Sequence, residues 1–296
     1  MAQPSYSDFL VWYDDLQAAV QKKLRRLDLS SLLGGQPLRI TGRAKTIDTL
    51  RQKLLAHPTW ALPSIYDIAG VRIEAEMNLL TQDAVASLVA GELGCNFHEV
   101  ASDTRATPHS GYRALHLRVP SAAGRFEVQV RTAAQGEWAN LYEHLGDKYG
   151  RGIRYDMMPV NGRGSRSVLA TQLLSVTVAT SELMCAGLEA TPEQWDAEGA
   201  RLTADWGAVK RWFHALCEKF EELGPHEANQ DWDVRFPELL AGMGRTLERG
   251  YNPRAGIARE DDFSRAKQDW AEFGASMTED LLQLRTKLQG KSARRR

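Results

Sequence analysis

The sequence predicts an α+β protein, in which a first half of strands and helices precedes an all-helical second half. Two segments carry the strand signal. Residues 65–73 are rich in β-branched side chains, and residues 126–131 alternate polar with apolar side chains, as a half-buried strand does. Beyond residues 159–165 strand signals nearly vanish, and apolar residues recur at helical spacing.

The first half contains further segments whose patterns predict helices and strands in turn. Apolar residues at three- and four-residue steps predict helices over 5–27, from 43 to about 57, over 80–93, and from 132 to about 150. Short apolar or alternating runs predict strands over 38–41, 96–100 and 112–119. The segment from Ser121 to Gly124 predicts a hairpin turn before the strand at 126–131.

In the second half, helical spacing predicts helices over 166–189, 193–223, 234–249 and 264–289. Thr191-Pro192 is typical of a helix start, and Gly224-Pro225 and Asn252-Pro253 are typical of breaks. Residues 159–165 are the best candidate linker. We therefore predict one domain over 1–158, with its core at 38–150, and a helical C-terminal extension over 166–296.

The composition is ordinary for a soluble globular protein, with 296 residues, 43% hydrophobic and 25% charged. The formal net charge of −1 gives no overall attraction to nucleic acid or membranes, so any polyanion site must be local. Cys95, Cys185 and Cys217 have no metal-ligand spacing and suit free thiols in a reducing compartment. The first residues lack signal-peptide features, and no uninterrupted apolar stretch is long enough to span a bilayer. We expect a cytoplasmic protein without a membrane segment.

Three cations lie where the strand at 38–41 passes into a helix. Arg43 and Lys45 are at the junction, and Lys53 follows about two turns along. A helix N-terminus favours anions through its unpaired N–H groups, and added cations strengthen that preference. The same spacing is equally typical of a solvated basic helix face. From the spacing alone, a phosphate site and an exposed basic face stay open.

Two carboxylates lie on the two best-defined strands, each near an arginine of its own strand. Asp67 precedes Arg72, and Glu127 precedes Arg131. One carboxylate from each of two neighbouring strands is a usual way to hold Mg²⁺ together with substrate phosphates and water. Two structural ion pairs, one at Asp67 and one between Glu127 and Arg131, are the alternative. Sequence alone leaves a magnesium site and structural pairs equally open.

The segment Ser110-Gly111-Tyr112 comes just before a strand that contains His116. A glycine followed by an aromatic residue can set a ring against a nucleobase. For a lone Gly-Tyr pair, an ordinary hairpin with a core tyrosine is the better interpretation. No Gly-x-x-x-x-Gly-Lys and no Gly-x-Gly-x-x-Gly run occurs, which disfavours P-loop and Rossmann chemistry.

Taken in order, these groups resemble the synthetase domain of the RelA/SpoT alarmone family, over about residues 38–150. Each motif alone is weak, whereas the ordered set is specific. The matching pieces are Gly42-Arg43-Ala44-Lys45, Lys53, Asp67 to Ile73, Gly111 to His116, Glu127 to Thr132, and Trp138-Ala139 through Glu143-His144. The resemblance implies a nucleotidyltransferase-like mixed sheet flanked by helices. It also implies transfer of the β,γ-pyrophosphate of ATP to a ribose 3′-hydroxyl, by a nucleotide pyrophosphokinase domain.

The resemblance also assigns the ATP-binding residues. In the family two arginines sandwich the adenine, and these map to Arg43 and Arg72. The lysines that bind the phosphates map to Lys45 and Lys53.

The metal and acceptor sites follow in the same way. The Mg²⁺ ligand maps to Asp67. The acid that helps to bind the metal, and that could activate the acceptor hydroxyl, maps to Glu127. The tyrosine that stacks on the acceptor guanine maps to Tyr112, with His116 and Gln129 close by. Asp67 and Glu127 are thus the predicted catalytic residues.

Departures from the family pattern bear on the acceptor. Ala114 stands where the family usually has serine, and Pro108 and His109 replace residues that many alarmone synthetases carry as lysine and asparagine. No His-Asp dipeptide occurs, so the family's hydrolase domain is missing. We expect a small, synthetase-only protein that uses ATP and a guanosine nucleotide, GDP or GTP, in the stringent response.

Two alternative functions stay open. One is a toxin of a toxin–antitoxin pair that pyrophosphorylates the tRNA 3′ end or makes adenosine alarmones, with tRNA and an antitoxin as partners. The other is a catalytically inactive, nucleotide-binding regulator. The helical half could pack on the synthetase, form a homo-oligomer interface or bind an antitoxin.

Overall fold

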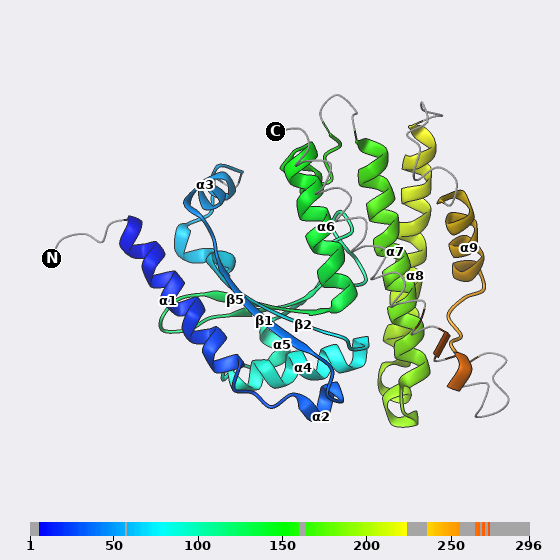
Figure 1. Cartoon of the computed structure of the whole chain (residues 1–296), viewed down its shortest axis with the longest axis horizontal. Coiled ribbons are helices and arrows are strands. Elements are labelled where there is room, and N and C mark those ends of the chain that lie inside the picture. The colour runs from blue at the N-terminus through cyan, green and yellow to red at the C-terminus, as the bar shows by residue number, and fades with distance from the viewer. Residues whose placement is uncertain are drawn as a thin grey trace. The chain divides into compact units, whose positions relative to one another are not determined.

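The computed structural model describes residues 6–56, 58–159, 164–223, 236–254, 264–266, 268–269 and 272. The chain divides into two compact units (Figure 1). The first comprises residues 1–103 and 114–133, and the second comprises residues 104–113 and 134–296. The predicted α+β class is confirmed, because a mixed sheet flanked by helices is followed by C-terminal helices.

The first unit is built on a five-stranded sheet in the order β1-β2-β5-β4-β3. Its strands are β1 (Leu38–Ala44), β2 (Ala69–Ala75), β3 (Ala101–Asp103), β4 (Leu115–Val119) and β5 (Phe126–Thr132). β2 and β5 are parallel neighbours, and the other three pairs are antiparallel. The predicted strand at 126–131 is confirmed in β5.

One face of this sheet is apolar and forms the core of the first unit. Ile73 on β2 and Val128 and Val130 on β5 have no solvent exposure. Helix α1 (Tyr6–Leu24) packs against β1 and β2, and α4 (Leu79–Glu92) packs against β4 and β5 (Figure 1). Because side chains alternate along a strand, the residues between these apolar positions share the opposite face.

The remaining elements of the first unit are short. They are α2 (Ser30–Leu33), α3 (Ile47–Ala56), α5 (Phe97–Val100) and 3₁₀ turns at Leu62–Ser64 and Tyr66–Ile68. The helices predicted over 5–27 and 80–93 are confirmed within one or two residues over the described part of the chain, as α1 and α4. The hairpin turn is also confirmed, by two backbone hydrogen bonds between Ser121 and Gly124.

Three boundaries and the type of one element in this part of the chain were predicted wrongly. The strand expected at 65–73 begins only at Ala69, because a 3₁₀ turn precedes it, and the strand expected at 112–119 begins at Leu115. The helix expected from Arg43 begins at Ile47, since the backbone of β1 stays paired with β2 through Ala44. The strand expected at 96–100 is helix α5, because the Asn96 side chain accepts a hydrogen bond from the His98 N–H and so caps a helical turn.

The second unit is helical over most of its described residues, and the helices predicted from 132 to about 150 and over 166–189, 193–223 and 234–249 are confirmed there within a few residues. Its helices are α6 (Ala133–Tyr149), a 3₁₀ turn (Arg151–Tyr155), α7 (Ser165–Glu189), α8 (Pro192–Glu222) and α9 (Phe236–Glu248). The predicted start of α8 is confirmed by a capping box between Thr191 and Gln194. Residues 160–163 of the predicted linker, the Gly224-Pro225 break and most of the helix predicted at 264–289 lie outside the described residues.

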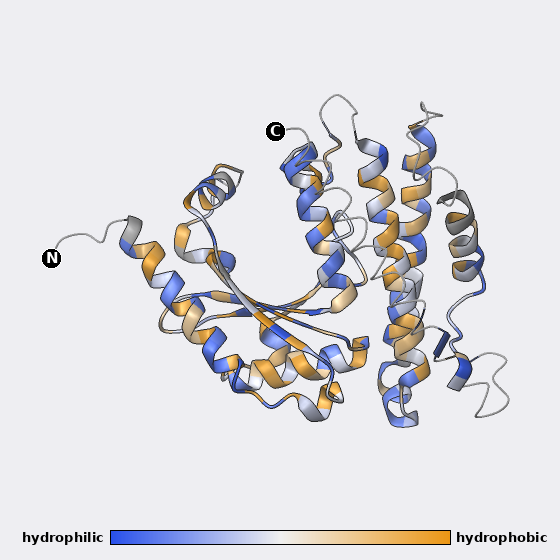
Figure 2. Cartoon of the chain, in the orientation of Figure 1, coloured by the Kyte–Doolittle hydropathy of each residue, from blue (hydrophilic) through white to orange (hydrophobic). Residues whose placement is uncertain are grey.

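Helix α7 bears on the expectation that the protein has no membrane segment. Within the described residues it is long and apolar enough to cross a membrane, with a mean hydropathy of 1.4 (Figure 2). However, 83% of its apolar window is buried inside the protein. Apart from Ser167, its Thr and Ser side chains are also buried, and Thr180 donates to the carbonyl oxygen of Val176 within the helix. α7 is therefore a core helix of the second unit.

A charge placed in the middle of α7 tests this assignment. Val176 has no solvent exposure, so Val176→Asp should lower the free energy of unfolding by about 3 kcal/mol or more, because it buries an unpaired carboxylate. Urea unfolding in detergent-free buffer measures the loss. Ser167→Asp adds the same charge in the partly exposed first turn of α7 and should have little effect. Equal stability of the two variants would contradict a buried α7.

Candidate active site

The face of the sheet opposite the core is polar and carries several of the predicted site residues. The parallel register of β2 and β5 places Gly70 opposite Glu127, Arg72 opposite Gln129, and Glu74 opposite Arg131. On the other side of β5, His116 of β4 lies opposite Gln129. Side chains at these positions share one face, so the predicted metal ligand Glu127 and the predicted acceptor residues His116 and Gln129 come together.

Glu127 is buried in this face and is held on both oxygens. His116 Nδ1 lies 2.9 Å from Oε1, and Gln129 Nε2 donates to Oε2 at 2.8 Å. Burial opposes ionisation of the carboxyl, but the hydrogen bonds from His116 and Gln129 and the charges of His116 and Arg118 outweigh it. Together they lower the pKa of Glu127 from 4.5 to about 2. Glu127 is therefore a carboxylate at neutral pH.

A chain of hydrogen bonds and ion pairs extends from Glu127 along the same face. The Gln129 side-chain oxygen accepts from Arg72 Nε at 3.3 Å and from Arg131 Nη2. Arg131 Nη1 in turn lies 3.6 Å from Glu74 Oε1. Because Gln129 joins Arg72 to Glu127, the predicted adenine-binding arginine and the predicted metal ligand belong to one network. Of the two ion pairs considered as an alternative, the one at Asp67 exists, with Lys45 and Lys53, whereas the described ion pair of Arg131 is with Glu74.

Asp67 lies in the 3₁₀ turn that leads into β2, three residues before the register partner of Glu127. Its Oδ2 lies 2.9 Å from Lys45 Nζ and 2.7 Å from Lys53 Nζ. Lys45 follows β1, and its backbone N–H donates to the carbonyl oxygen of Ile68, while Lys53 comes from α3. The two predicted phosphate-binding lysines therefore converge on the predicted metal ligand, from two different elements.

The other oxygen of Asp67 fits a metal ligand. Oδ1 is buried and has no hydrogen-bond partner among the described residues. A buried carboxylate oxygen without a partner is costly unless a cation takes that position. No group of three or more His, Cys, Asp and Glu side chains suited to a metal exists in the described part of the chain. Mg²⁺ needs no such cage, because it is held by one or two carboxylates together with water and substrate phosphates. Asp67 Oδ1 therefore fits a Mg²⁺ ligand.

The backbone register locates Arg43 in the sheet. It lies on β1 opposite Gly70 of β2, at the edge where β2 and β5 begin. In the register, Gly70 adds no side chain between Arg43 and Glu127.

Tyr112 belongs to the second unit, in the segment 104–113. It is half-buried and packs against the cluster that contains Trp138 and Tyr142 of α6. Its backbone N–H donates to the carbonyl oxygen of His109, which makes a tight turn just before β4. The turn needs Gly111, whose φ is +90° and whose added Cβ would lie 2.8 Å from the Trp138 ring.

Three residues that sequence reasoning missed hold this turn. Ser110, with a φ of +54°, donates to Asp156 Oδ1 at 2.7 Å. Ser175 Oγ of α7 donates to the Gly111 carbonyl oxygen at 2.6 Å, and Glu182 of α7 pairs with Arg113 at 2.6 Å. No motif marks Asp156, Ser175 or Glu182. Only Glu182 could have been noticed from the sequence, because it is a charged residue within the apolar pattern of α7.

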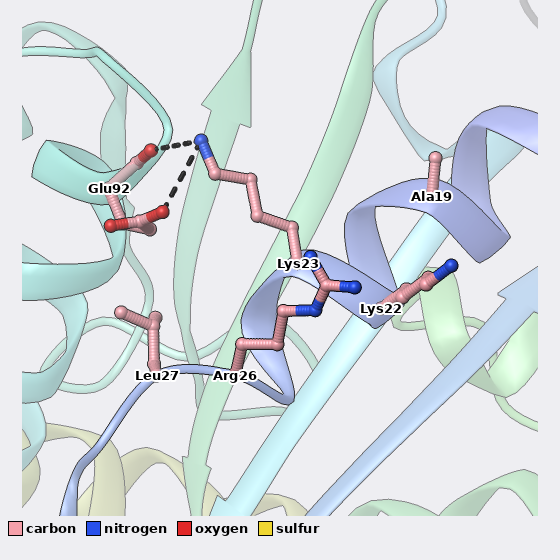
Figure 3. A pocket seen from close by; sticks show the side chains of 6 residues that line it. All are labelled: Ala19, Lys22, Lys23, Arg26, Leu27 and Glu92. Atoms are coloured by element: carbon pink, nitrogen blue, oxygen red, sulfur yellow. Dashed lines mark hydrogen bonds and ion pairs between the residues drawn. The ribbon is translucent and has the colours of Figure 1, made fainter.

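A described pocket lies apart from these residues. It has a volume of about 530 Å³ and is lined by Ala19, Lys22, Lys23, Arg26, Leu27 and Glu92 (Figure 3). Lys23 Nζ donates to the Glu92 carbonyl oxygen at 2.6 Å and lies 3.4 Å from the Glu92 carboxylate. None of the predicted site residues lines this pocket, which we therefore do not assign to the candidate active site.

Comparison with known proteins agrees with the family resemblance. Residues 42–151 match the family described as "Region found in RelA / SpoT proteins". The chain therefore contains a RelA/SpoT region. Uncharacterized proteins of Mycobacterium tuberculosis and Mycobacterium bovis are 44% identical over 156 residues, which is 53% of this chain and 55% of each relative. The chain thus spans about half the length of the curated relatives it matches.

Solved structures of small alarmone synthetases are also similar. Small alarmone synthetase 1 from Bacillus subtilis is 24% identical over 59% of this chain and 94% of that chain, with a TM-score of 0.43. Small alarmone synthetase 2 from the same organism is 21% identical over 60% of this chain and 95% of that chain, with a TM-score of 0.44. Synthetase 1 has also been solved bound to its product pppGpp and bound to AMPCPP.

Gly111→Ala tests the turn before Tyr112. A Cβ at this position would meet the Trp138 ring and would also be strained by the positive φ, so we expect a loss of about 2 kcal/mol or more in the free energy of unfolding. Gly34→Ala is the control for backbone strain alone, because Gly34 is in the left-handed region with a φ of +58° but has nothing within 4 Å of an added Cβ. It should cost about 1 kcal/mol. Equal losses, measured by urea unfolding, would contradict the close contact with Trp138.

The ionisation of Glu127 predicts a dependence of stability on pH. Because the folded pKa of about 2 lies below the ordinary 4.5, Glu127 stabilises the protein fully above pH 4.5 and loses this contribution as the pH falls toward 2. The difference in free energy of unfolding between the wild type and Glu127→Gln should be at most roughly 3 kcal/mol at neutral pH. This difference in free energy of unfolding should become smaller as the pH falls below 4.5. A difference that stays constant from pH 6 to pH 3 would contradict the lowered pKa.

Proposed function

We propose that this protein is a nucleotide pyrophosphokinase that transfers the β,γ-pyrophosphate of ATP to the 3′-hydroxyl of a guanosine nucleotide, GDP or GTP. The observation that best supports the proposal is the arrangement at Asp67. One carboxylate oxygen is buried and has no hydrogen-bond partner among the described residues, while two lysine ammonium groups contact the other. A divalent cation and a polyphosphate together need this combination of charges.

In the proposed reaction the acceptor 3′-oxygen forms a bond to the β-phosphorus of ATP. The bond from that phosphorus to the oxygen bridging the α- and β-phosphates breaks, and AMP leaves with the electron pair. The hydroxyl proton passes to a base or to water. Such transfers need positioning and neutralisation of charge more than a nucleophilic side chain, which agrees with a site built from Lys, Arg and carboxylates.

Asp67 and Glu127 would hold Mg²⁺, which when bound neutralises charge on the transferred phosphates. Asp67 would offer Oδ1, and each oxygen of Glu127 keeps a lone pair beyond its present hydrogen bond. Once a cation neutralises Asp67, the ammonium groups of Lys45 and Lys53 become available to phosphate oxygens. The two lysines would then orient the triphosphate at the same place where they now contact Asp67.

The pKa of Glu127 distinguishes between the two roles that the family resemblance implies for it, metal ligand and general base. An effective general base has a pKa near the working pH, whereas the pKa of Glu127 is about 2. Such a carboxylate is a weak base but is always ionised, as a metal ligand must be. We therefore propose that Glu127 binds the metal and that it does not keep the hydroxyl proton.

The nucleotide-binding roles follow the family pattern. Arg43 and Arg72 would hold the adenine, and the hydrogen bond between Arg72 and Gln129 limits the positions of that guanidinium. Tyr112 would stack on the guanine of the acceptor, and His116 and Gln129 would be further acceptor-binding residues. The departures at Pro108, His109 and Ala114 affect the acceptor side, so an adenosine nucleotide or a tRNA 3′ end is the alternative acceptor.

An acceptor screen tests the reaction. Purified protein, Mg²⁺ and ATP labelled in the γ-phosphate are incubated with GDP, GTP, AMP, ADP, ATP or total tRNA, and both AMP release and label transfer are measured. We expect transfer to GDP or GTP. Transfer to tRNA alone would favour the toxin-type alternative, and absence of AMP release with every acceptor would favour the inactive regulator.

Asp67→Asn tests the metal site. The substitution removes the charge while keeping the shape, so we expect a fall in kcat of about 100-fold or more. Asp48→Asn removes the same charge from an exposed position in the first turn of α3 and should leave kcat nearly unchanged. Urea unfolding confirms that both variants are folded. Near-normal turnover by a folded Asp67→Asn variant would refute the assignment.

A further inference from the structure

We infer that helix α7 positions the acceptor-binding loop, with Glu182 and Ser175 as the positioning residues. The loop comprises residues 104–113 and carries Tyr112. This inference rests on the proposed function, which gives Tyr112 its role at the acceptor. The match to the RelA/SpoT region ends at residue 151, whereas α7 begins at Ser165. The helical half would therefore supply part of the acceptor site, although it lies outside the matched region.

The first attachment is a buried ion pair between the loop and α7. Arg113 Nη1 lies 2.6 Å from Glu182 Oε2, and the two side chains are only 3% and 9% exposed. Gln135 Nε2 of α6 lies 3.1 Å from each oxygen of Glu182. A buried charge is tolerated only with partners in good geometry, so Arg113 has few alternative positions. Its Nε also donates to the carbonyl oxygen of Arg105 at 2.8 Å, which ties both ends of the loop to α7.

The second attachment lies on the other side of Tyr112. Ser175 Oγ of α7 donates to the Gly111 carbonyl oxygen at 2.6 Å, and this bond is buried. Gly111 itself lies against the Trp138 ring, and an added Cβ would be 3.4 Å from the Gln172 backbone. Tyr112 is therefore held between two residues, Gly111 and Arg113, that both bond to α7.

Two residues in left-handed backbone conformations bond to each other, one in the loop and one after α6. Ser110 has a φ of +54° and Asp156 a φ of +57°. Ser110 Oγ donates to Asp156 Oδ1, and the Asp156 N–H donates back to Ser110 Oγ at 3.0 Å. His109 Nδ1 lies 2.9 Å from Asp156 Oδ2. Such conformations persist in non-glycine residues only where surrounding contacts fix them, which indicates a pre-set loop.

A pre-set loop has a direct effect on acceptor binding. An aromatic ring that is already in place loses little conformational freedom when a base stacks on it. If α7 released the loop, the ordering cost would be added to acceptor binding but not to ATP binding, because Tyr112 is proposed to contact only the acceptor. The expected result is a rise in the KM for the acceptor with an unchanged KM for ATP.

The experiment compares two pairs of variants in the full chain. Glu182→Gln removes the charge that faces Arg113, and Ser175→Ala, the milder change, removes the bond to Gly111. Thr180→Val is the control for Ser175→Ala, because Thr180 is a buried hydroxyl of α7 that donates only to the Val176 carbonyl oxygen of its own helix in the bonds described. Leu202→Ala controls for loss of stability, since Leu202 is fully buried in α8 and does not belong to the loop.

Two readouts are needed. Hydrogen exchange measures protection of the backbone amides in 104–113, and steady-state kinetics gives the KM for acceptor and for ATP. We expect faster exchange in the loop and a rise of about five- to tenfold in acceptor KM for Glu182→Gln and Ser175→Ala, corresponding to loss of one buried hydrogen bond. Both controls should keep the wild-type loop exchange and acceptor KM.

The outcomes separate this inference from the proposed function. The inference would be overturned if the backbone amides of 104–113 exchanged at the wild-type rate in both Glu182→Gln and Ser175→Ala. It would also be overturned if these variants raised the KM for the acceptor and the KM for ATP equally. If the wild type transferred pyrophosphate to no acceptor, the proposed function would fail. Loop exchange would then still decide whether α7 holds the loop.

Discussion

The parallel pairing of β2 with β5 is the constraint on which the candidate site depends. Because the two strands run in the same direction, their starting ends meet at one edge of the sheet, where Asp67 precedes β2 and Glu127 is the second residue of β5. The same register aligns Arg72 with Gln129 and so links the proposed adenine and acceptor residues. A slip of β5 by one residue would turn Glu127 and Gln129 toward the apolar core.

Charge balance explains how such a site exists without its ligands. Two lysines and one aspartate form a cluster in which the proposed phosphate-binding groups stabilise the proposed metal-binding group. Glu127 is stabilised separately, by His116 and Gln129. Asp67 and Glu127 therefore each have partners among the described residues.

Most of the elements were predictable because they depend on local patterns. The alternation of Glu127, Gln129 and Arg131 with apolar residues gave β5, and helical spacing gave α6, α7, α8 and α9 over the described residues. The errors arose where a local signal competed with a side-chain or tertiary contact. The β-branched run at 65–68 forms a 3₁₀ turn whose Ile68 carbonyl accepts from the Lys45 N–H, and Asn96 converts an apparent strand into a helical turn.

By itself, the sequence determined the α+β class, the polar face of β5 and the ordered set of motifs that resembles the RelA/SpoT region, because these follow from residue type and spacing. Only the tertiary structure decided which charges meet. Nothing in the spacing of Lys45, Lys53 and Asp67 required two ammonium groups on one carboxylate oxygen. Likewise, 69 residues separate Arg113 from Glu182, so their buried pair exists only because α7 packs against the loop that contains Arg113. Contacts between residues distant in sequence depend on packing, and local patterns do not encode packing.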